Sequence, residues 1–280
     1  MPTERGLDLI RALEVATDIA HEAGALIREA FGAVGRVAFK GAVNPVTETD
    51  EAAEALIVRR LREVFPDHQI LGEESGRAGD GDGPLWFVDP LDGTNNFAHG
   101  LPQFAVSLGL RMGDKALVGV IYDPLRDETF AASRGGGATL NGLEIAVTGV
   151  GRLSEAFLAT GFPYNRRVAA FNNTQTLDHF LRRSQGVRRA GSAALDIAYV
   201  ACGRFDGYWE PGLHPWDVAA GVLVVEEAGG RVSDFSGARA RLLSGEEVVA
   251  SNGLIHDEML TVLRLGPAAP HPDFPELGVP

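Results

Sequence analysis

The chain has 280 residues, of which 45% are hydrophobic and 22% are charged, a composition typical of globular proteins that bury a core. Lys and Arg number 25 against 38 Asp and Glu, so the formal net charge of -13 argues against a nucleic-acid surface that depends on bulk positive charge. The same charge would repel a phosphorylated ligand unless bound cations reversed it locally.

The cysteine content and the apolar runs bear on the cellular location of the protein. A single cysteine, Cys202, excludes an internal disulfide and a multi-thiolate metal site, and it is typical of a reducing environment. The N-terminus lacks the apolar core of a signal peptide, and no run approaches the roughly 18 apolar residues of a membrane span. We therefore expect a cytoplasmic protein without membrane contact.

Two helices are predicted in the first part of the chain. Apolar residues recur every three or four positions from Leu9 to Ala30, with charged residues on the other side, which predicts an amphipathic helix. Thr47 and Asp50 have the spacing of a capping box, which predicts a second helix that runs toward Val64. Asp50 would then lie in a first helical turn.

The pattern then changes to short apolar runs with turn residues between them, which predicts strands. The expected strands are 69–71, 85–88, 104–110, 116–122 and 128–132, and the last three form an antiparallel meander. A second cycle predicts strands at 156–160, 230–234 and 248–251 and helices at 171–183, 192–201 and 217–228. We divide the chain into an α+β half (1–145), an α/β half (146–265) and a Pro-rich, flexible tail (266–280).

Acidic residues follow a buried strand at residues 86–97. Asp89 and Asp92 flank Pro90, which restricts the backbone so that both acids and the Leu91 carbonyl could converge on one point. Oxygen ligands in that number suit Mg²⁺ better than zinc. Gly93 allows close backbone approach, and a short helix that opens at Thr94 would offer free N–H groups to a phosphate. A turn with capping acids is the alternative.

Two further acids stand beside predicted elements. Glu73 and Glu74 follow a strand, and for Glu74 we favour a solvated loop. Asp217 begins a helix, where N-capping would explain it as well as metal ligation would. Together the acidic sites favour a metal centre more strongly than any one of them does.

These segments resemble the inositol monophosphatase family, which lies within the lithium-sensitive, metal-dependent phosphatase superfamily. The matching segments are 72–75, 89–97, 216–221 and 227–230, with lesser matches from 7 to 262. The resemblance implies an α+β/α/β layered αβαβα sandwich, a homodimer, and a phosphatase that uses two or three Mg²⁺ ions. The implied substrate is a small phosphorylated metabolite, with inositol monophosphate the leading one.

The resemblance also implies roles for individual residues. The implied metal ligands are Glu73, Asp89, Asp92, Asp217 and the Leu91 carbonyl. The phosphate would lie on the N–H groups of Gly93 and Thr94. Glu73 and the Thr94 hydroxyl would orient a metal-activated water for in-line attack, and Asp50 would hold Thr94. No covalent phospho-enzyme is expected.

The resemblance implies a second group of residues, which would bind the alcohol part of the substrate. In the family, the positions of Gly191, Ser192, Ala193 and Glu210 bind the inositol ring, beside Asp92 and Asp217, and a carboxylate can accept hydrogen bonds from vicinal hydroxyls. Gly191 and Ser192 could instead cap the following helix, and Glu210 could be a surface acid.

Other interpretations remain open. Related enzymes with the same metal motifs act on fructose-1,6-bisphosphate, histidinol phosphate, NADP or adenosine bisphosphate. The arginines at 182–183 and 188–189 could bind a second phosphate, although a solvated face is the simpler interpretation. Some bacterial relatives also act on transcription, which would require RNA or polymerase binding. A calcium loop at Asp80–Gly83 is disfavoured because no glutamate closes it.

Overall fold

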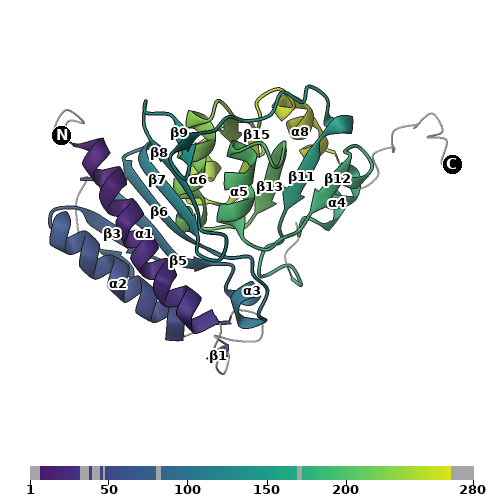
Figure 1. The fold of residues 1–280 in the computed structure, drawn as a ribbon. Helices are drawn as coiled ribbons and strands as arrows, with labels where there is room; N and C mark the ends of the chain where they lie inside the picture. Colours follow the sequence, from purple (N-terminus) through teal and green to yellow (C-terminus); the bar gives the residue numbers. More distant parts are fainter. Residues whose placement is uncertain are drawn as a thin grey trace.

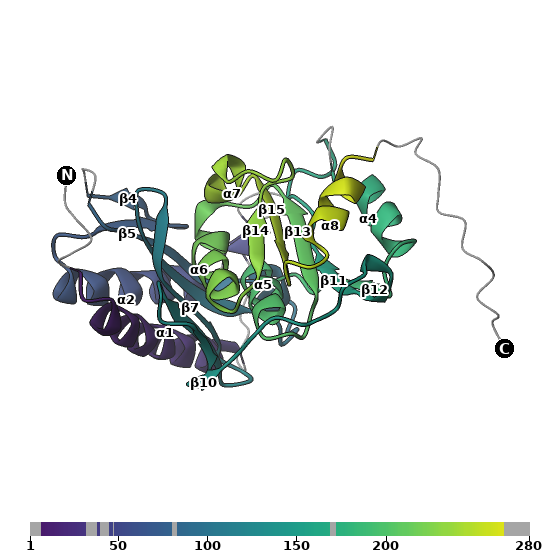
Figure 2. The ribbon, with the colours of Figure 1, turned by 90° about the horizontal axis from the view of Figure 1, so that it is seen from above.

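The chain folds into alternating layers of helix and sheet (Figure 1). The computed structural model describes residues 7–31, 48–79, 83–168 and 172–265, together with the backbone of 38–39 and 45–46. The predicted cap at Thr47, the loop at 80–82 and the tail at 266–280 lie outside the described residues. Figure 2 shows the same order of layers from above.

Two helices form the outer layer at the N-terminal end of the chain. They are α1 (Leu9–Phe31) and α2 (Glu48–Val64), and both match their predicted ranges closely. The buried face of α1 carries Ala16, Ile19 and Ile27. That of α2 carries Ile57 and Leu61, and this apolar stripe packs on the first sheet.

Among the described residues, the first sheet has eight strands in the order β10-β9-β8-β7-β6-β5-β3-β4. Its strands are β3 (Gln69–Gly72), β4 (Gly76–Ala78), β5 (Leu85–Asp92), β6 (Ala105–Met112), β7 (Lys115–Asp123), β8 (Glu128–Ser133), β9 (Ala138–Leu140) and β10 (Leu143–Glu144). The antiparallel meander is confirmed as β6, β7 and β8.

The pairing of β5 places the acidic segments. β3 runs parallel to β5, with Gly72 opposite Val88, so both strands end at the same edge. The register of β5 against β6 shifts between Asp89 and Asp92, as in a β-bulge. The short helix α3 (Thr94–Ala98) then begins as predicted. A bulge next to a strand end redirects side chains, and here it redirects two acids.

The second sheet has five strands within the described part, in the order β12-β11-β13-β15-β14. Its strands are β11 (Phe157–Thr160), β12 (Gly186–Arg188), β13 (Gly207–Pro211), β14 (Arg231–Ser233) and β15 (Glu247–Ser251). β13 was not predicted, because its five residues begin with glycine and end with proline, both typical of turns. All five are buried nonetheless.

The remaining helices flank the second sheet. They are α4 (Thr174–Leu181), α5 (Ala193–Ala201), α6 (Pro215–Glu227), α7 (Ala240–Ser244) and α8 (His256–Leu263). Helix α4 is shorter than predicted, and Phe171 lies outside the described residues. Helices α5 and α6 lie between the two sheets, while α4 and α8 pack on the far side (Figure 1). This is the predicted αβαβα sandwich.

Two glycines bring α6 close to the first sheet. A Cβ atom on Gly109 of β6 would lie 2.7 Å from the Cβ of Ala219, and one on Gly119 of β7 would lie 2.5 Å from the carbonyl oxygen of Ala220. Only a residue without a side chain fits at either position. The close approach sets the position of Asp217 in the first turn of α6.

Three short features complete the described chain. The backbone at β1 (Ala38–Phe39) pairs antiparallel with β2 (Pro45–Val46), and a 3-10 turn spans Leu153–Glu155. No helix in the described part of the chain combines the length and the apolar character that a membrane span requires.

Candidate active site

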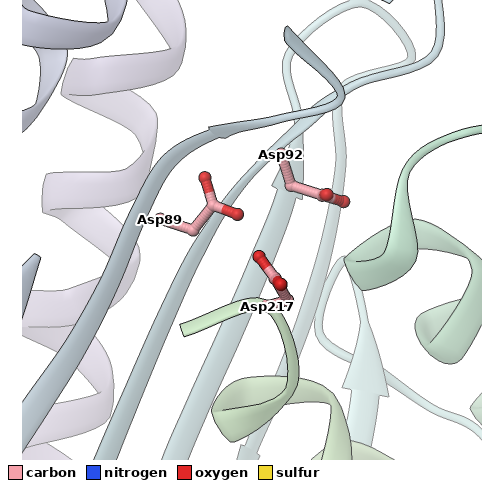
Figure 3. Close-up of side chains that lie close together, drawn as sticks. All are labelled: Asp89, Asp92 and Asp217. Carbon is pink, nitrogen blue, oxygen red and sulfur yellow. The ribbon is translucent and has the colours of Figure 1, made fainter. Parts of the chain in front are cut away.

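Three carboxylates meet where β5 ends and α6 begins. Asp89, Asp92 and Asp217 each present an oxygen, and these oxygens lie within 4.8 Å of one another (Figure 3). Asp89 and Asp92 reach this point through the bulge in β5, and Asp217 enters from the opposite layer. Three acids that the sequence predicted as metal ligands in two separate segments therefore lie together.

Glu73 reaches the same cavity from β3. Its backbone N–H donates to the carbonyl oxygen of Val88 at 3.1 Å, which ties the residue to β5. Glu73 lines the cavity but is not one of the three acids within 4.8 Å. Burial, together with the carboxylates of Asp217 and Asp50, raises the pKa of Glu73 to about 8.

The cluster carries negative charge in a buried place. Burial and the charge of Asp92 raise the pKa of Asp217 to about 7. Burial and the charge of Glu73 raise the pKa of Asp89 well above its ordinary value. Burial also raises the pKa of Asp92, against hydrogen bonds that lower it. Carboxylates that crowd together without a compensating cation resist ionisation. A set of oxygen donors in this state fits a hard divalent cation.

Asp217 also caps its own helix. Its Oδ2 accepts the backbone N–H of His214 at 2.7 Å, the arrangement of a capping box. The two interpretations of Asp217 left open by the sequence are therefore compatible, because a carboxylate has a second oxygen and further lone pairs.

The turn after β5 is restricted to glycine. Gly93 has φ of 98°, and a Cβ atom there would lie 2.8 Å from the carbonyl oxygen of Gln103. Both Gly93 and Thr94 line the cavity. The Thr94 hydroxyl donates to the Leu91 carbonyl at 3.1 Å. The Leu91 carbonyl, which was predicted as a metal ligand, therefore already accepts one hydrogen bond.

Asp50 lies close enough to Glu73 to raise its pKa. It is buried in the first turn of α2, as the capping pattern predicted. The predicted contact of Asp50 with Thr94 stays a prediction.

The residues expected at the alcohol side surround the same cavity, whose volume is about 480 Å³. Gly191, Ala193 and Glu210 line it. Glu210 is buried in β13 and accepts the hydroxyl of Tyr208, which excludes the surface-acid interpretation. Burial raises the pKa of Glu210 to about 8.

Ser192 takes a different position from its neighbours. It is not among the cavity-lining residues, and its Oγ accepts the N–H of Leu195 at 3.4 Å, so it caps α5. The same hydroxyl donates to Asp92 Oδ2 at 2.5 Å. Ser192 therefore contacts an acid of the cluster instead of the open cavity.

Sequence reasoning missed several polar residues. Asp196, Tyr164 and Arg166 line the cavity, and Asp196 is 1% exposed. Of the four arginines considered for a second phosphate, only Arg189 lines it. Glu54 is also buried, and its position on the apolar face of α2 is a signal that the sequence contained. An acid on a buried helix face needs polar partners.

Comparisons with known proteins all lead to one family. The model of the inositol monophosphatase family matches residues 8–265. An inositol-1-monophosphatase of Synechocystis sp. is 46% identical over 262 residues, which cover 93% of this chain and 91% of the relative. The Nus factor SuhB of Escherichia coli is 44% identical, with 90% and 95% covered.

A solved structure shows the same fold. The inositol monophosphatase of Anabaena sp. matches with a TM-score of 0.86 and 44% identity, covering 94% of this chain and 99% of that one. The match of the family model over nearly the whole chain, together with these relatives, identifies the chain as a member of the inositol monophosphatase family, metal-dependent enzymes that hydrolyse phosphoric monoesters.

Proposed function

We propose that this protein is a magnesium-dependent phosphatase whose leading substrate is inositol monophosphate. The observation that carries the proposal is the set of three carboxylates, Asp89, Asp92 and Asp217, with oxygens within 4.8 Å of one another beside a cavity of about 480 Å³. Cavities of this size hold small ligands.

The metal ligands in this proposal are Glu73, Asp89, Asp92, Asp217 and the Leu91 carbonyl. When bound, two or three Mg²⁺ ions would neutralise the charge of the phosphate and lower the pKa of a water. Because the pKa of Glu73 is raised to about 8 and that of Asp217 to about 7, a cation that binds below those pH values would displace protons from the two groups.

The phosphate would lie on the backbone N–H groups of Gly93 and Thr94. Glu73 and the Thr94 hydroxyl would orient the attacking water, and Asp50 would hold Thr94. Thr94 is buried, and its hydroxyl donates a hydrogen bond to the Leu91 carbonyl. This bond limits rotation of the hydroxyl. A fixed hydroxyl orients a water at lower entropic cost than a free one.

The ring hydroxyls would be bound by Gly191, Ala193 and Glu210. Glu210 is held by Tyr208, which leaves its other oxygen to accept hydrogen bonds. Ser192 would act through Asp92 instead of touching the substrate.

Hydrolysis of a panel of phosphate esters tests this function. The panel contains inositol monophosphate, fructose-1,6-bisphosphate, histidinol phosphate, NADP and adenosine bisphosphate, each with Mg²⁺ and with EDTA. We expect the highest kcat/KM for inositol monophosphate and no turnover with EDTA. Turnover that persists in EDTA would refute the metal dependence, and a preference for another ester would reassign the substrate.

A second candidate is a regulatory role in transcription. It is suggested by the E. coli relative, which is a Nus factor. The net charge of -13 opposes binding to RNA through bulk charge. Salt-sensitive binding of this protein to RNA or to RNA polymerase would support the role. Homodimerisation, lithium sensitivity and a cytoplasmic location stay predictions.

A further inference from the structure

Glu54 holds the backbone next to Glu73. This acid of α2 is 2% exposed, and its two carboxylate oxygens accept different N–H groups of the loop after β3. Oε2 accepts the N–H of Glu74 at 2.8 Å, and Oε1 accepts the N–H of Ser75 at 2.7 Å. A buried carboxylate with both oxygens used in this way makes strong, directional bonds.

The loop is shaped to admit this carboxylate. A Cβ atom on Gly72 would lie 2.6 Å from the carboxyl carbon of Glu54, so any side chain there would displace the acid. Gly72 also pairs with Gly76 across the loop and with Val88 of β5. The loop is thus attached to α2 on one side and to the first sheet on the other.

Glu73 lies between these attachments. Its own N–H is bound by Val88, and the next two N–H groups are bound by Glu54. The backbone on both sides of Glu73 is therefore fixed, although the residue lies in a turn. Glu73 nevertheless lines the cavity that contains the three-acid cluster.

We infer that Glu54 is a positioning residue for the metal site: it fixes the loop so that the Glu73 carboxylate enters the cavity in the direction that metal binding requires. The inference rests on the proposed role of Glu73 as a metal ligand. Glu54 does not line the cavity, so it acts through the backbone of Glu74 and Ser75. Partners of this kind commonly change metal affinity by about 10-fold to 100-fold when they are altered.

The test compares Glu54→Gln with a matched control. Gln has the shape of Glu but places an NH₂ group against one of the two N–H donors. The control is Asp206→Asn, because Asp206 is also buried and also accepts a backbone N–H, from Phe157 at 2.6 Å, but does not line the cavity. Both variants replace a buried carboxylate by an amide, and only Glu54→Gln does so beside Glu73.

Two measurements need no substrate. The affinity for Mn²⁺, a paramagnetic substitute for Mg²⁺, is measured by EPR of the free ion. Amide hydrogen exchange of Glu74 and Ser75 is measured in metal-free protein. We expect Glu54→Gln to weaken Mn²⁺ binding about tenfold. We also expect it to speed exchange at both amides about tenfold. Asp206→Asn should leave both quantities at wild-type values.

A second variant guards against a Glu54→Gln protein that fails to fold. Gly72→Ala keeps the acid but pushes a methyl group against it, and we expect the same loss of Mn²⁺ affinity. The inference is overturned if the folded variants lose thermal stability yet bind Mn²⁺ like wild type, or if wild type binds no Mn²⁺. A wild type that binds Mn²⁺ but hydrolyses no ester refutes the proposed function alone.

Discussion

Ser192 donates its hydroxyl to Asp92 Oδ2 at 2.5 Å, and the two residues stand 100 positions apart in the chain. The same oxygen accepts the backbone N–H of Ala194 at 2.8 Å. Two donors at the start of α5 thus bind Asp92 Oδ2, and the Oδ1 atom of Asp92 accepts neither of these bonds. This contact joins the layer that holds α5 to the end of β5.

Ser192→Ala removes that hydroxyl and the cap of α5. We expect a loss of about 1–2 kcal/mol in the free energy of unfolding, since a cap and a charge-assisted hydrogen bond are lost. We also expect a higher Mg²⁺ concentration for half-maximal turnover, because Asp92 is less well oriented. Urea unfolding and a magnesium titration measure the two effects. Ser192→Thr, which keeps the hydroxyl, is the control, and equal magnesium dependence in the Ala variant would contradict the assignment.

Asp217→Asn separates capping from metal binding. Asn retains an oxygen that accepts the His214 N–H, so the helix cap survives. It removes the negative charge, and we expect the barrier to rise by about 3 kcal/mol, roughly a hundredfold loss in kcat/KM. Steady-state kinetics at saturating Mg²⁺ measure the change, with circular dichroism as the check on folding. Wild-type turnover would show that Asp217 is a cap and nothing more.

The stability of the metal-free protein should fall with rising pH. The pKa of Glu73 is raised from 4.5 to about 8 and that of Asp217 from 3.8 to about 7. Between the ordinary and the raised pKa of each group, the folded state binds more protons than the unfolded state. Stability therefore declines as pH rises toward about 8. His256, whose pKa burial lowers to about 4, acts in the opposite direction only below its ordinary value of 6.5.

The informative window is therefore pH 6.5 to 8.5, roughly the range above the ordinary histidine pKa. We expect the melting temperature without metal to drop by about 5 °C across it, and Mg²⁺ to reverse the drop at the upper end. Differential scanning calorimetry with and without EDTA measures both. A melting temperature that rises across the window would contradict the assignment, and Asp217→Asn should make the drop smaller, because Glu73 still titrates in this variant.

The position of α6 depends on glycines in the sheet beneath it. A methyl group at Gly119 would lie 2.5 Å from the carbonyl oxygen of Ala220, so Gly119→Ala must push α6 outward. We expect about 1–3 kcal/mol less stability in urea unfolding. Because Asp217 lies in the first turn of α6, we also expect a higher Mg²⁺ concentration for half-maximal turnover. Gly149→Ala, where a Cβ meets nothing within 4 Å and φ is not positive, controls for the added methyl group alone. Equal effects of both variants would contradict the packing argument.

The sequence predicted what local patterns encode. The meander, the first two helices and the acids at 89–92 follow from periodicity, turn residues and the Asp-Pro-Leu-Asp segment. It did not predict β13, because the strand begins with Gly207 and ends with Pro211, and both residue types are typical of turns. Nor could it predict that Ser192 bonds Asp92, since that contact depends on how two layers pack. Glu54 was overlooked although it interrupts an apolar helix face, and its partners lie in another segment.

Glu210→Gln tests recognition of the alcohol. Glu210 is buried, receives the Tyr208 hydroxyl and lines the cavity, so its replacement should weaken hydrogen bonds from vicinal ring hydroxyls. We expect KM for inositol monophosphate to rise roughly tenfold in assays above about pH 8, where Glu210 is ionised, since one charged hydrogen bond contributes about 1.5 kcal/mol. Turnover of p-nitrophenyl phosphate, which has no vicinal hydroxyls, should stay at the wild-type level and controls for damage to the metal site. A parallel loss on both substrates would mean that Glu210 supports the fold or the metal cluster, and not the alcohol.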